Sequence, residues 1–364
     1  MVGVDPRVER YAELLVSRCV DAQPGWEVLV QSSPLARPLV DEVVRALARR
    51  GAYAIPRIHF SQWSYPVDPL WVEEAPLEAV AQLPSIERET LLGCDARIVV
   101  VAPENTREGA GLPADKLAAL RDAFKEHSQR VVSLTYPWVG CQYPVPAYAQ
   151  DAGLTLRAFE DFLYGACLLD WDEVARSMEP IKERFDRASQ VRLVGEGTDL
   201  TFSLEGREGR IDDGKVNMPG GEVFYSPVED SAEGVVEFSE FPAVYFGREV
   251  TGVRLRLEGG RVVDASARAN EEFLVETLDT DEGARRFGEF GIGCNPGITR
   301  HMRNTLYDEK IYGTVHLALG AGFPFIGGVN ESRVHWDIVK DLRAGGRIEC
   351  DGETVQDSGS WTLG

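Results

Sequence analysis

The first half of the chain alternates short apolar runs with longer amphipathic segments. Apolar runs at residues 26–30, 53–58, 97–102 and 131–135 have the length expected of buried strands. Between them, residues 35–50 and 114–127 repeat apolar side chains at helical spacing, and Gly51 follows the first of these helices at the position of a C-terminal stop. This alternation predicts an α/β fold class for the first half, as a three-layer domain around a parallel sheet.

The pattern changes at Val191. Two helices, expected at 156–170 and 172–188, precede this point. Beyond it, several segments alternate apolar with polar residues, as half-buried strands do, and Glu258-Gly259-Gly260 predicts a tight hairpin between two of them. One helix is expected between Asn270 and Leu278. We therefore predict an N-terminal α/β domain over residues 1–190 and a C-terminal β-rich α+β domain over 191–364.

Charge and cysteine content narrow the class of protein. The chain has 38 basic and 59 acidic residues and a net charge of −21, so nucleic acid and anionic membranes are not expected partners. No apolar run approaches the roughly 18 residues that a membrane-spanning helix needs. Six cysteines lack any Cys-x-x-Cys pair, and the N-terminus lacks a basic segment followed by an apolar one. We expect a cytoplasmic protein with free thiols.

The Gly-rich segments of the second half contain side chains of the types that bind metal ions. The candidate ligands are Glu222, Glu289, His316, His335 and Asp337. A His-x-Asp pair on a strand projects both side chains to one face, where they can converge on one ion. Each residue alone could equally be structural, but five such ligands suffice for two divalent ions that share a carboxylate. The sequence has no Gly-x-Ser-x-Gly, Walker or His-Glu-x-x-His motif that would indicate another mechanism.

Several segments resemble the thermophilic-aminopeptidase family of metallopeptidases, the group of aminopeptidase T, aminopeptidase S and PepS. The resemblance extends from about residue 136 to the end of the chain, whereas the first 135 residues match only in general character. The segments that carry it include Asp199-Leu200-Thr201-Phe202, Asn217-Met218-Pro219-Gly220-Gly221-Glu222-Val223-Phe224, Pro227-Val228-Glu229-Asp230-Ser231, Asp308-Glu309-Lys310 and Gly327-Gly328-Val329-Asn330-Glu331-Ser332.

The resemblance implies a homodimeric enzyme of two domains that removes N-terminal amino acids from short peptides with two divalent metal ions. Its ligands would be the five residues named above. Among them, we expect Glu289 to be the bridging carboxylate. Zinc, cobalt, manganese and magnesium all accept such mixed carboxylate and imidazole ligands. Glu309, just before His316, is a candidate proton shuttle, or else a salt-bridged structural residue.

One position departs from the family pattern. The family has a tyrosine seven residues after the first ligand histidine, and this chain has Phe323 there. Loss of a hydrogen-bond donor to a developing oxyanion costs about 2–4 kcal/mol of transition-state stabilisation. Tyr225 and Tyr312 lie near ligands in the sequence, so each is a candidate substitute phenol or, alternatively, a packed structural residue.

Two other functions remain open. A ring-cleaving dihydroxypyridine dioxygenase group resembles the same fold, and His316, His335 and Asp337 would form a two-His-one-carboxylate site for a single non-haem Fe(II) ion. Such a site does not need Glu222 and Glu289. The second alternative is a non-catalytic, peptide-binding metalloprotein, with which Phe323 is compatible.

Overall fold

The protein folds into two compact units. The computed structural model describes residues 5–63 and 65–362. The first unit comprises Met1–Leu168 with Gly214–Met218, and the second comprises Leu169–Asp213 with Pro219–Gly364. The sequence places the boundary at residue 190, but helix α10 (Trp171–Asp186) packs on strands of the second unit, where the ring of Phe185 lies 5.8 Å from that of Phe290. The amphipathic pattern of a helix does not reveal which sheet it covers.

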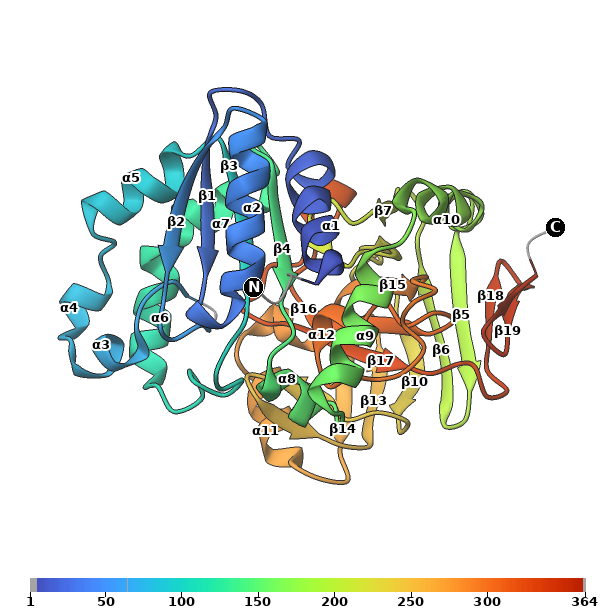
Figure 1. The fold of residues 1–364 in the computed structure, drawn as a ribbon. Helices are drawn as coiled ribbons and strands as arrows, with labels where there is room; N and C mark the ends of the chain where they lie inside the picture. Colours follow the sequence, from blue (N-terminus) through green and yellow to red (C-terminus); the bar gives the residue numbers. More distant parts are fainter. Residues whose placement is uncertain (1–4, 64, 363–364) are drawn as a thin grey trace. The chain divides into compact units, whose positions relative to one another are not determined.

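The first unit is built on a parallel sheet of five strands in the order β2-β1-β3-β4-β8 (Figure 1). Its strands are β1 (Glu27–Ser32), β2 (Tyr53–Ile58), β3 (Ala96–Val101), β4 (Trp138–Gln142) and β8 (Asn217–Met218). Val28, Leu29 and Val30 follow one another in β1 and are all fully buried, so both faces of the sheet are covered. This confirms the predicted α/β class.

Helices complete the first unit. They are α1 (Pro6–Leu14), α2 (Arg37–Arg49), α3 (Pro69–Glu74), α4 (Leu77–Val80), α5 (Ser85–Gly93), α6 (Ala114–Ala123), α7 (Lys125–Val132), α8 (Pro146–Asp151) and α9 (Leu156–Cys167), with short helical turns at Leu15–Cys19 and Pro34–Ala36. The strand predicted at 131–135 is wrong, because Val131 and Val132 continue α7 and Leu134 then adopts φ 51°, which ends the helix. The strand that enters the sheet there is β4.

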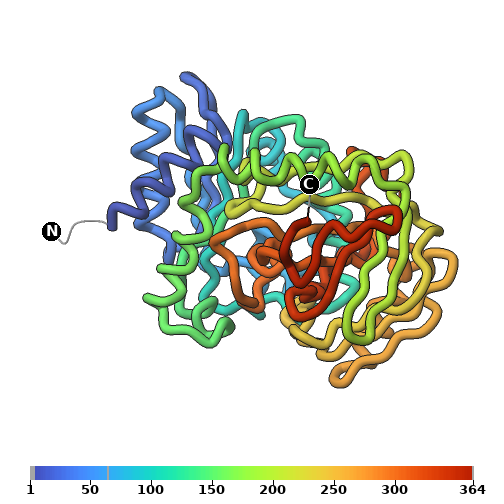
Figure 2. Tube along the Cα trace, turned by 90° about the vertical axis from the view of Figure 1, so that its right-hand side faces the viewer, coloured from blue at the N-terminus to red at the C-terminus, as the bar shows by residue number. Residues whose placement is uncertain are grey.

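The second unit contains a sheet of eight strands in the order β14-β13-β10-β6-β5-β18-β19-β20. Its strands are β5 (Gln190–Gly195), β6 (Thr198–Ser203), β10 (Glu233–Phe238), β13 (Val253–Glu258), β14 (Arg261–Ser266), β18 (Arg347–Cys350), β19 (Glu353–Asp357) and β20 (Ser360–Trp361). The predicted hairpin joins β13 to β14. The C-terminal strands, red in Figure 1 and Figure 2, lie beside β5, with which β18 pairs antiparallel.

A second, five-stranded antiparallel sheet of this unit has the order β17-β16-β15-β9-β7. Its strands are β7 (Arg210–Asp212), β9 (Glu222–Tyr225), β15 (Phe287–Gly293), β16 (Val315–Gly320) and β17 (His335–Lys340). The remaining elements are the hairpin of β11 (Ala243–Tyr245) and β12 (Arg248–Val250), helices α11 (Glu271–Leu278) and α12 (Thr305–Asp308), and helical turns at Glu282–Arg285 and Pro324–Ile326. The unit is β-rich, as predicted, and α11 confirms the expected helix.

None of the helices formed by the described residues is long and apolar enough to cross a membrane. All six cysteines are buried, and none of them forms a disulfide within the described structure.

Candidate metal centre

All five predicted ligands project from one face of the five-stranded sheet. Strand pairing places Glu222 of β9 opposite Gly293 of β15, and His316 of β16 opposite Gly291. In the same way, Glu289 of β15 and Asp337 of β17 lie on either side of Ala318, and His335 lies opposite Gly320. Because side chains alternate along a strand, these registers put the five ligand candidates together on what we call the site face. The opposite, core face carries Tyr225, Phe290 and Trp336.

Small residues leave room for these side chains. A Cβ atom on Gly291 would lie 2.0 Å from Cε1 of His316 and 2.1 Å from its Nε2, so the imidazole ring occupies the space that any larger residue would need. Gly293 is equally confined, because its Cβ would lie 2.1 Å from the carbonyl oxygen of Ile311. The glycines of these strands therefore have a physical role on the site face.

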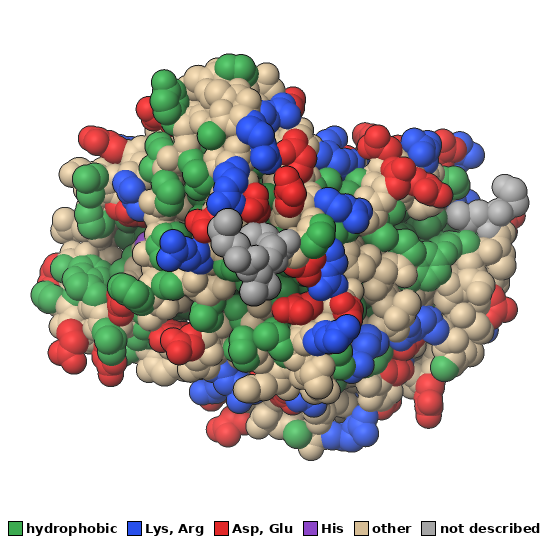
Figure 3. Space-filling model, viewed as in Figure 1, with side chains coloured by type: hydrophobic (Ala, Val, Ile, Leu, Met, Phe, Trp, Pro, Cys, Tyr) green, Lys and Arg blue, Asp and Glu red, His purple; other side chains and the backbone are tan. Residues whose placement is uncertain are grey.

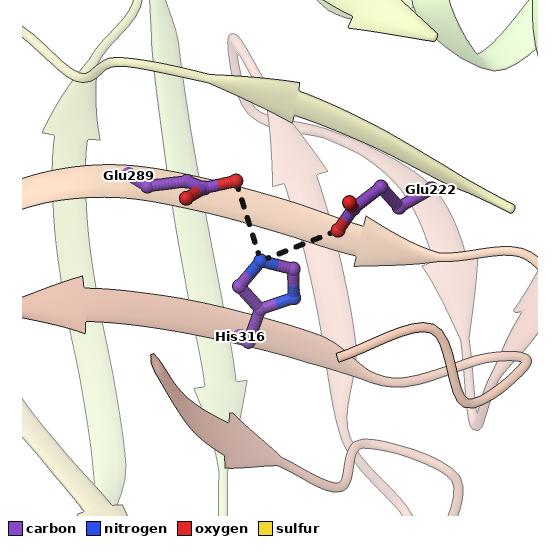
Figure 4. A group of neighbouring side chains, drawn as sticks. All are labelled: Glu222, Glu289 and His316. Atoms are coloured by element: carbon purple, nitrogen blue, oxygen red, sulfur yellow. Dashed lines mark ion pairs between the residues drawn. The ribbon is translucent and has the colours of Figure 1, made fainter. Parts of the chain in front are cut away.

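The ligand atoms form two groups that share one residue. Glu222, Glu289 and His316 make the first group, and Glu289, His335 and Asp337 the second. Nε2 of His316 lies 3.5 Å from both Glu222 Oε2 and Glu289 Oε1. Figure 4 draws these two ion pairs as dashed lines. Nε2 of His335 lies 3.2 Å from the other oxygen, Glu289 Oε2, and 3.6 Å from Asp337 Oδ1. Glu289 thus presents one carboxylate oxygen to each histidine.

Backbone carbonyl groups orient both imidazole rings. Nδ1 of His316 lies 3.0 Å from the carbonyl oxygen of Glu309, and Nδ1 of His335 lies 3.0 Å from that of Ala321. A carbonyl oxygen can only accept, so each Nδ1–H donates, and each Nε2 is left facing the carboxylates, where it would be the deprotonated ligand atom of a bound ion. This tautomer is the one that metal-binding histidines adopt.

Three atoms of the centre are buried and accept or donate no hydrogen bond within the described structure. They are Glu222 Oε2, His316 Nε2 and Asp337 Oδ1. Leaving such atoms unsatisfied costs about 1–3 kcal/mol each, more where a charge is involved. Divalent cations bound by the two ligand groups would satisfy all three, and mixed carboxylate and imidazole ligands suit zinc, cobalt, manganese and magnesium. The residues therefore fit a metal site.

The centre also carries an excess of negative charge. Asp212 of β7 lies opposite Glu222, and its Oδ2 is 3.8 Å from Nζ of Lys310, which also pairs with Glu222 and Glu309. When ionised, the five carboxylates of Asp212, Glu222, Glu289, Glu309 and Asp337 and the one ammonium group leave a net charge of minus four. Burial, reinforced by Glu289, raises the pKa of Asp337 to about 6.

The centre is open on one side. The side chain of His335 is 32% exposed, whereas those of His316 and Glu289 are 1% and 6% exposed. The ring of Phe323 lies 5.1 Å from the imidazole of His335, so the position at which the family has a tyrosine borders the open side. Phe224, two residues after Glu222 on the same face of β9, lies 5.8 Å from Phe323.

Tyr225 does not reach the centre, so its predicted role as a substitute phenol is wrong. It follows Glu222 by three residues and therefore points to the core face. There its hydroxyl lies 3.0 Å from both the carbonyl oxygen of Lys182 and Oδ1 of Asp186, and its ring packs beside Phe185. Tyr312 has 43% of its surface exposed and joins the described structure through a backbone hydrogen bond to Ile298, with no bond from its hydroxyl to a described residue.

Glu309 lies next to the centre. Its carboxylate forms an ion pair with Lys310, as the structural interpretation of the sequence expected. Together with Asp337 it also lines a small cavity, which His301, Asp308 and Val339 help to enclose. Proton transfer by Glu309 therefore stays a prediction, and its position beside the cavity is compatible with that role.

Two neighbours of the ligands are not identifiable from ligand patterns in the sequence. Lys310 belongs to the family-like segment Asp308-Glu309-Lys310, but a lysine is not a ligand type, and its contact with Glu222 depends on the fold. Asp212 has no local signal, because only the register of β7 with β9 brings it beside Glu222.

Comparison with known proteins gives the family of the chain. The model of the thermophilic metalloprotease (M29) family matches residues 4–361. Aminopeptidase AmpS of Bacillus subtilis is 28% identical over the full length of both chains. The structure of wild-type AmpT from Thermus thermophilus superposes with a TM-score of 0.82 over 99% of this chain and 100% of that one, at 24% identity. A 2,5-dihydroxypyridine dioxygenase of Pseudomonas putida shares the fold at 15% identity, with a TM-score of 0.62 over 100% of this chain and 99% of that one. The family match spans nearly the whole chain, and the chain therefore belongs to the thermophilic metalloprotease family, M29.

Proposed function

We propose that the protein is a metal-dependent aminopeptidase that removes N-terminal amino acids from short peptides. Two divalent ions would be held by Glu222, Glu289 and His316 on one side and by Glu289, His335 and Asp337 on the other. The observation that carries this proposal is the position of Glu289, whose two carboxylate oxygens each face a different histidine. Family membership and the full-length similarity to an aminopeptidase support it.

The charge of the centre supports two ions and not one. With all five carboxylates ionised and both imidazoles neutral, two divalent ions neutralise the net charge of minus four, whereas a single ferrous ion would leave two negative charges among side chains that are mostly buried. Glu222 and Glu289, which a single-iron site does not need, are two of the most deeply buried carboxylates of the group. The dioxygenase likeness concerns the fold alone.

Bound ions would supply an ionised water at neutral pH and polarise the scissile carbonyl group. The protein's own side chains have three further tasks. The backbone-anchored histidines keep their Nε2 atoms directed at the centre, and Glu289 fixes the spacing of the two ligand groups. Glu309, which lines the cavity, would take up the proton of the attacking water at its carboxylate and return it to the leaving amine. The excess of carboxylates favours the positively charged N-terminus of a peptide over an internal bond.

The lack of a phenol at position 323 sets the expected rate. Phe323 borders the centre but has no donor for a developing oxyanion. Hydrolysis would therefore depend on the ions and on Glu309, and we expect a lower turnover than a tyrosine at this position would give.

The remaining parts of the proposal concern the setting of the enzyme. Thiols that form no disulfide in the described structure suit the reducing cytoplasm. Acidic and basic side chains are interspersed on the surface drawn in Figure 3, and the net charge of −21 disfavours binding to nucleic acid or anionic membranes. Homodimer formation is expected from the family resemblance, and sedimentation equilibrium would test it.

A panel of short peptides tests the activity. We expect release of the first amino acid, loss of activity with a chelator, and recovery when zinc, cobalt or manganese is restored. N-acetylated versions of the same peptides serve as the matched control and should resist cleavage, because they lack the N-terminal charge. Cleavage of free and acetylated peptides at equal rates would contradict an aminopeptidase. Oxygen uptake with a dihydroxypyridine in place of peptide cleavage would favour the dioxygenase.

A further inference from the structure

A fully buried lysine lies directly behind the metal centre. Lys310 has an exposure of 0% and follows helix α12. Its Nζ atom lies 3.3 Å from Glu222 Oε1 and 3.8 Å from Asp212 Oδ2, and it forms an ion pair with Glu309. Three carboxylates thus surround one ammonium group that has no contact with water.

The backbone of Lys310 is fixed on both sides. Its N–H donates to the carbonyl oxygen of Tyr307 at 3.0 Å, and its own carbonyl oxygen accepts from the N–H of Asn295 at 3.1 Å. Asn295 in turn donates from its side chain to the carbonyl oxygen of Gly220, two residues before Glu222. The lysine and the start of strand β9 are therefore held by one hydrogen-bonded framework.

The two oxygens of Glu222 have different partners. Oε1 faces Nζ of Lys310, and Oε2, which accepts no hydrogen bond from a described residue, lies 3.5 Å from Nε2 of His316. Without the lysine, Oε1 would lose the cation that faces it, and Asp212 and Glu309 would repel the carboxylate.

We propose that Lys310 is a positioning residue that fixes the carboxylate of Glu222, so that one oxygen is held by the ammonium group and the other is directed to the ion of the Glu222–Glu289–His316 group. This inference rests on the proposed two-ion function. Lys310 acts through Glu222 and contributes in particular to one of the two ion sites. Both the charge and the position of the ammonium group matter, because Nζ has to lie within reach of Glu222 Oε1 to hold it.

Zinc titration of the metal-stripped, full-length protein by calorimetry tests this role. In the wild type we expect two zinc ions per chain. In Lys310→Met, one ion should bind about tenfold more weakly, the size of effect found when a group that orients a ligand is removed, while the other keeps its affinity. In a Glu222→Gln background, Lys310→Met should cause no further loss, because the lysine acts through that carboxylate.

Lys340→Met is the matched control. Lys340 is also buried, at 1% exposure, and its Nζ pairs with Glu240 at 2.5 Å, outside the centre. This variant loses a buried lysine and its ion pair, and it should keep both zinc affinities. If Lys310→Met does not fold, Lys310→Arg gives a second test, because it retains the charge but moves the donor atoms. Positioning predicts a weakened ion in Lys310→Arg, whereas a pure charge effect predicts none.

The outcomes separate this inference from the proposed function. A wild type that binds two ions, with Lys310→Met binding both equally well or more tightly, would overturn the role of Lys310 and leave the two-ion function intact. Equal weakening of both ions in the Lys310 and Lys340 variants would show a merely structural effect and would also overturn it. A wild type that binds no divalent ion would overturn the two-ion function and, with it, the role of Lys310.

Discussion

The two faces of the β17-β16-β15-β9-β7 sheet are made by the same strands but follow opposite rules. On the core face, Phe290 packs between the rings of Phe185 and Phe202, at 5.8 Å and 4.9 Å, and the hydroxyl of Tyr225 has its hydrogen-bond partners. The buried Nε1 of Trp336 has no partner among the described residues, but it is a single donor with no other unsatisfied group beside it on this face. On the site face, buried oxygen and nitrogen atoms converge without such partners. Satisfied polar groups stabilise a fold, whereas converging unsatisfied ones indicate a site that binds cations.

Replacing the shared carboxylate should have the largest effect on the site face. In Glu289→Gln, an amide offers only one oxygen, so it cannot serve both ligand groups. We expect a loss of kcat/KM of about a thousandfold and fewer bound ions, because metal activation contributes several kcal/mol. Peptide kinetics and elemental analysis would measure both. Glu272→Gln, at an exposed position on α11, is the control and should retain both properties. Full activity in Glu289→Gln would rule out its bridging role.

A methyl group at Gly291 tests how tightly the site face is built. In Gly291→Ala the new Cβ would collide with the imidazole of His316, which must move. A displacement of about 1 Å in such a site costs about a hundredfold in rate, and we expect kcat/KM to fall by that amount. Gly165→Ala is the control, because a Cβ at that helical glycine meets no atom within 4 Å. Unchanged activity in Gly291→Ala would mean that catalysis does not depend on the exact position of the His316 imidazole.

The open side of the metal centre is tested by placing the family's tyrosine at position 323. In Phe323→Tyr, a phenol would lie beside His335 on the open side of the centre. We expect turnover to rise by about tenfold, since an oxyanion donor is worth about 2–4 kcal/mol when ideally placed. Phe325→Tyr, which changes a neighbouring ring of the same surface, should have no such effect. A rise in KM with no gain in kcat would show that position 323 contacts substrate only.

The smallest effect is expected on the core face. In Tyr225→Phe, the hydrogen-bond partners Lys182 and Asp186 are lost, and we expect a decrease of about 1 kcal/mol in the free energy of unfolding. Peptide hydrolysis should change by less than about twofold, because the hydroxyl is on the far side of β9. Denaturant titration and peptide kinetics measure the two. A large loss of turnover with normal stability would contradict the separation of the two faces.

Local sequence patterns predict the parts of the site that lie on one strand. The His335-x-Asp337 spacing indicated one face of one strand, and β17 confirms it. Ligand chemistry and family resemblance identified the five residues that the sheet brings together. Positions that depend on long-range pairing were not predictable: Asp212 joins the centre only through the register of β7 with β9.

The same limit applies to the fold. Alternating strands and helices predicted the parallel sheet, because that pattern is local. The domain to which α10 belongs depends on which sheet its apolar side covers, and its sequence does not show this. The apolar pair Val131-Val132 resembles the start of a strand, although it forms the end of helix α7. Tyr225 was misjudged because sequence distance from Glu222 was considered without the alternation of a strand.

Metal content is the most direct test of the central claim. We would purify the protein anaerobically without chelator or affinity-tag histidines and measure zinc, cobalt, manganese, magnesium and iron per chain. The charge of the site face and the shared position of Glu289 predict two divalent ions per chain. A single iron ion per chain, or a chain that binds no divalent metal, would contradict the two-ion centre.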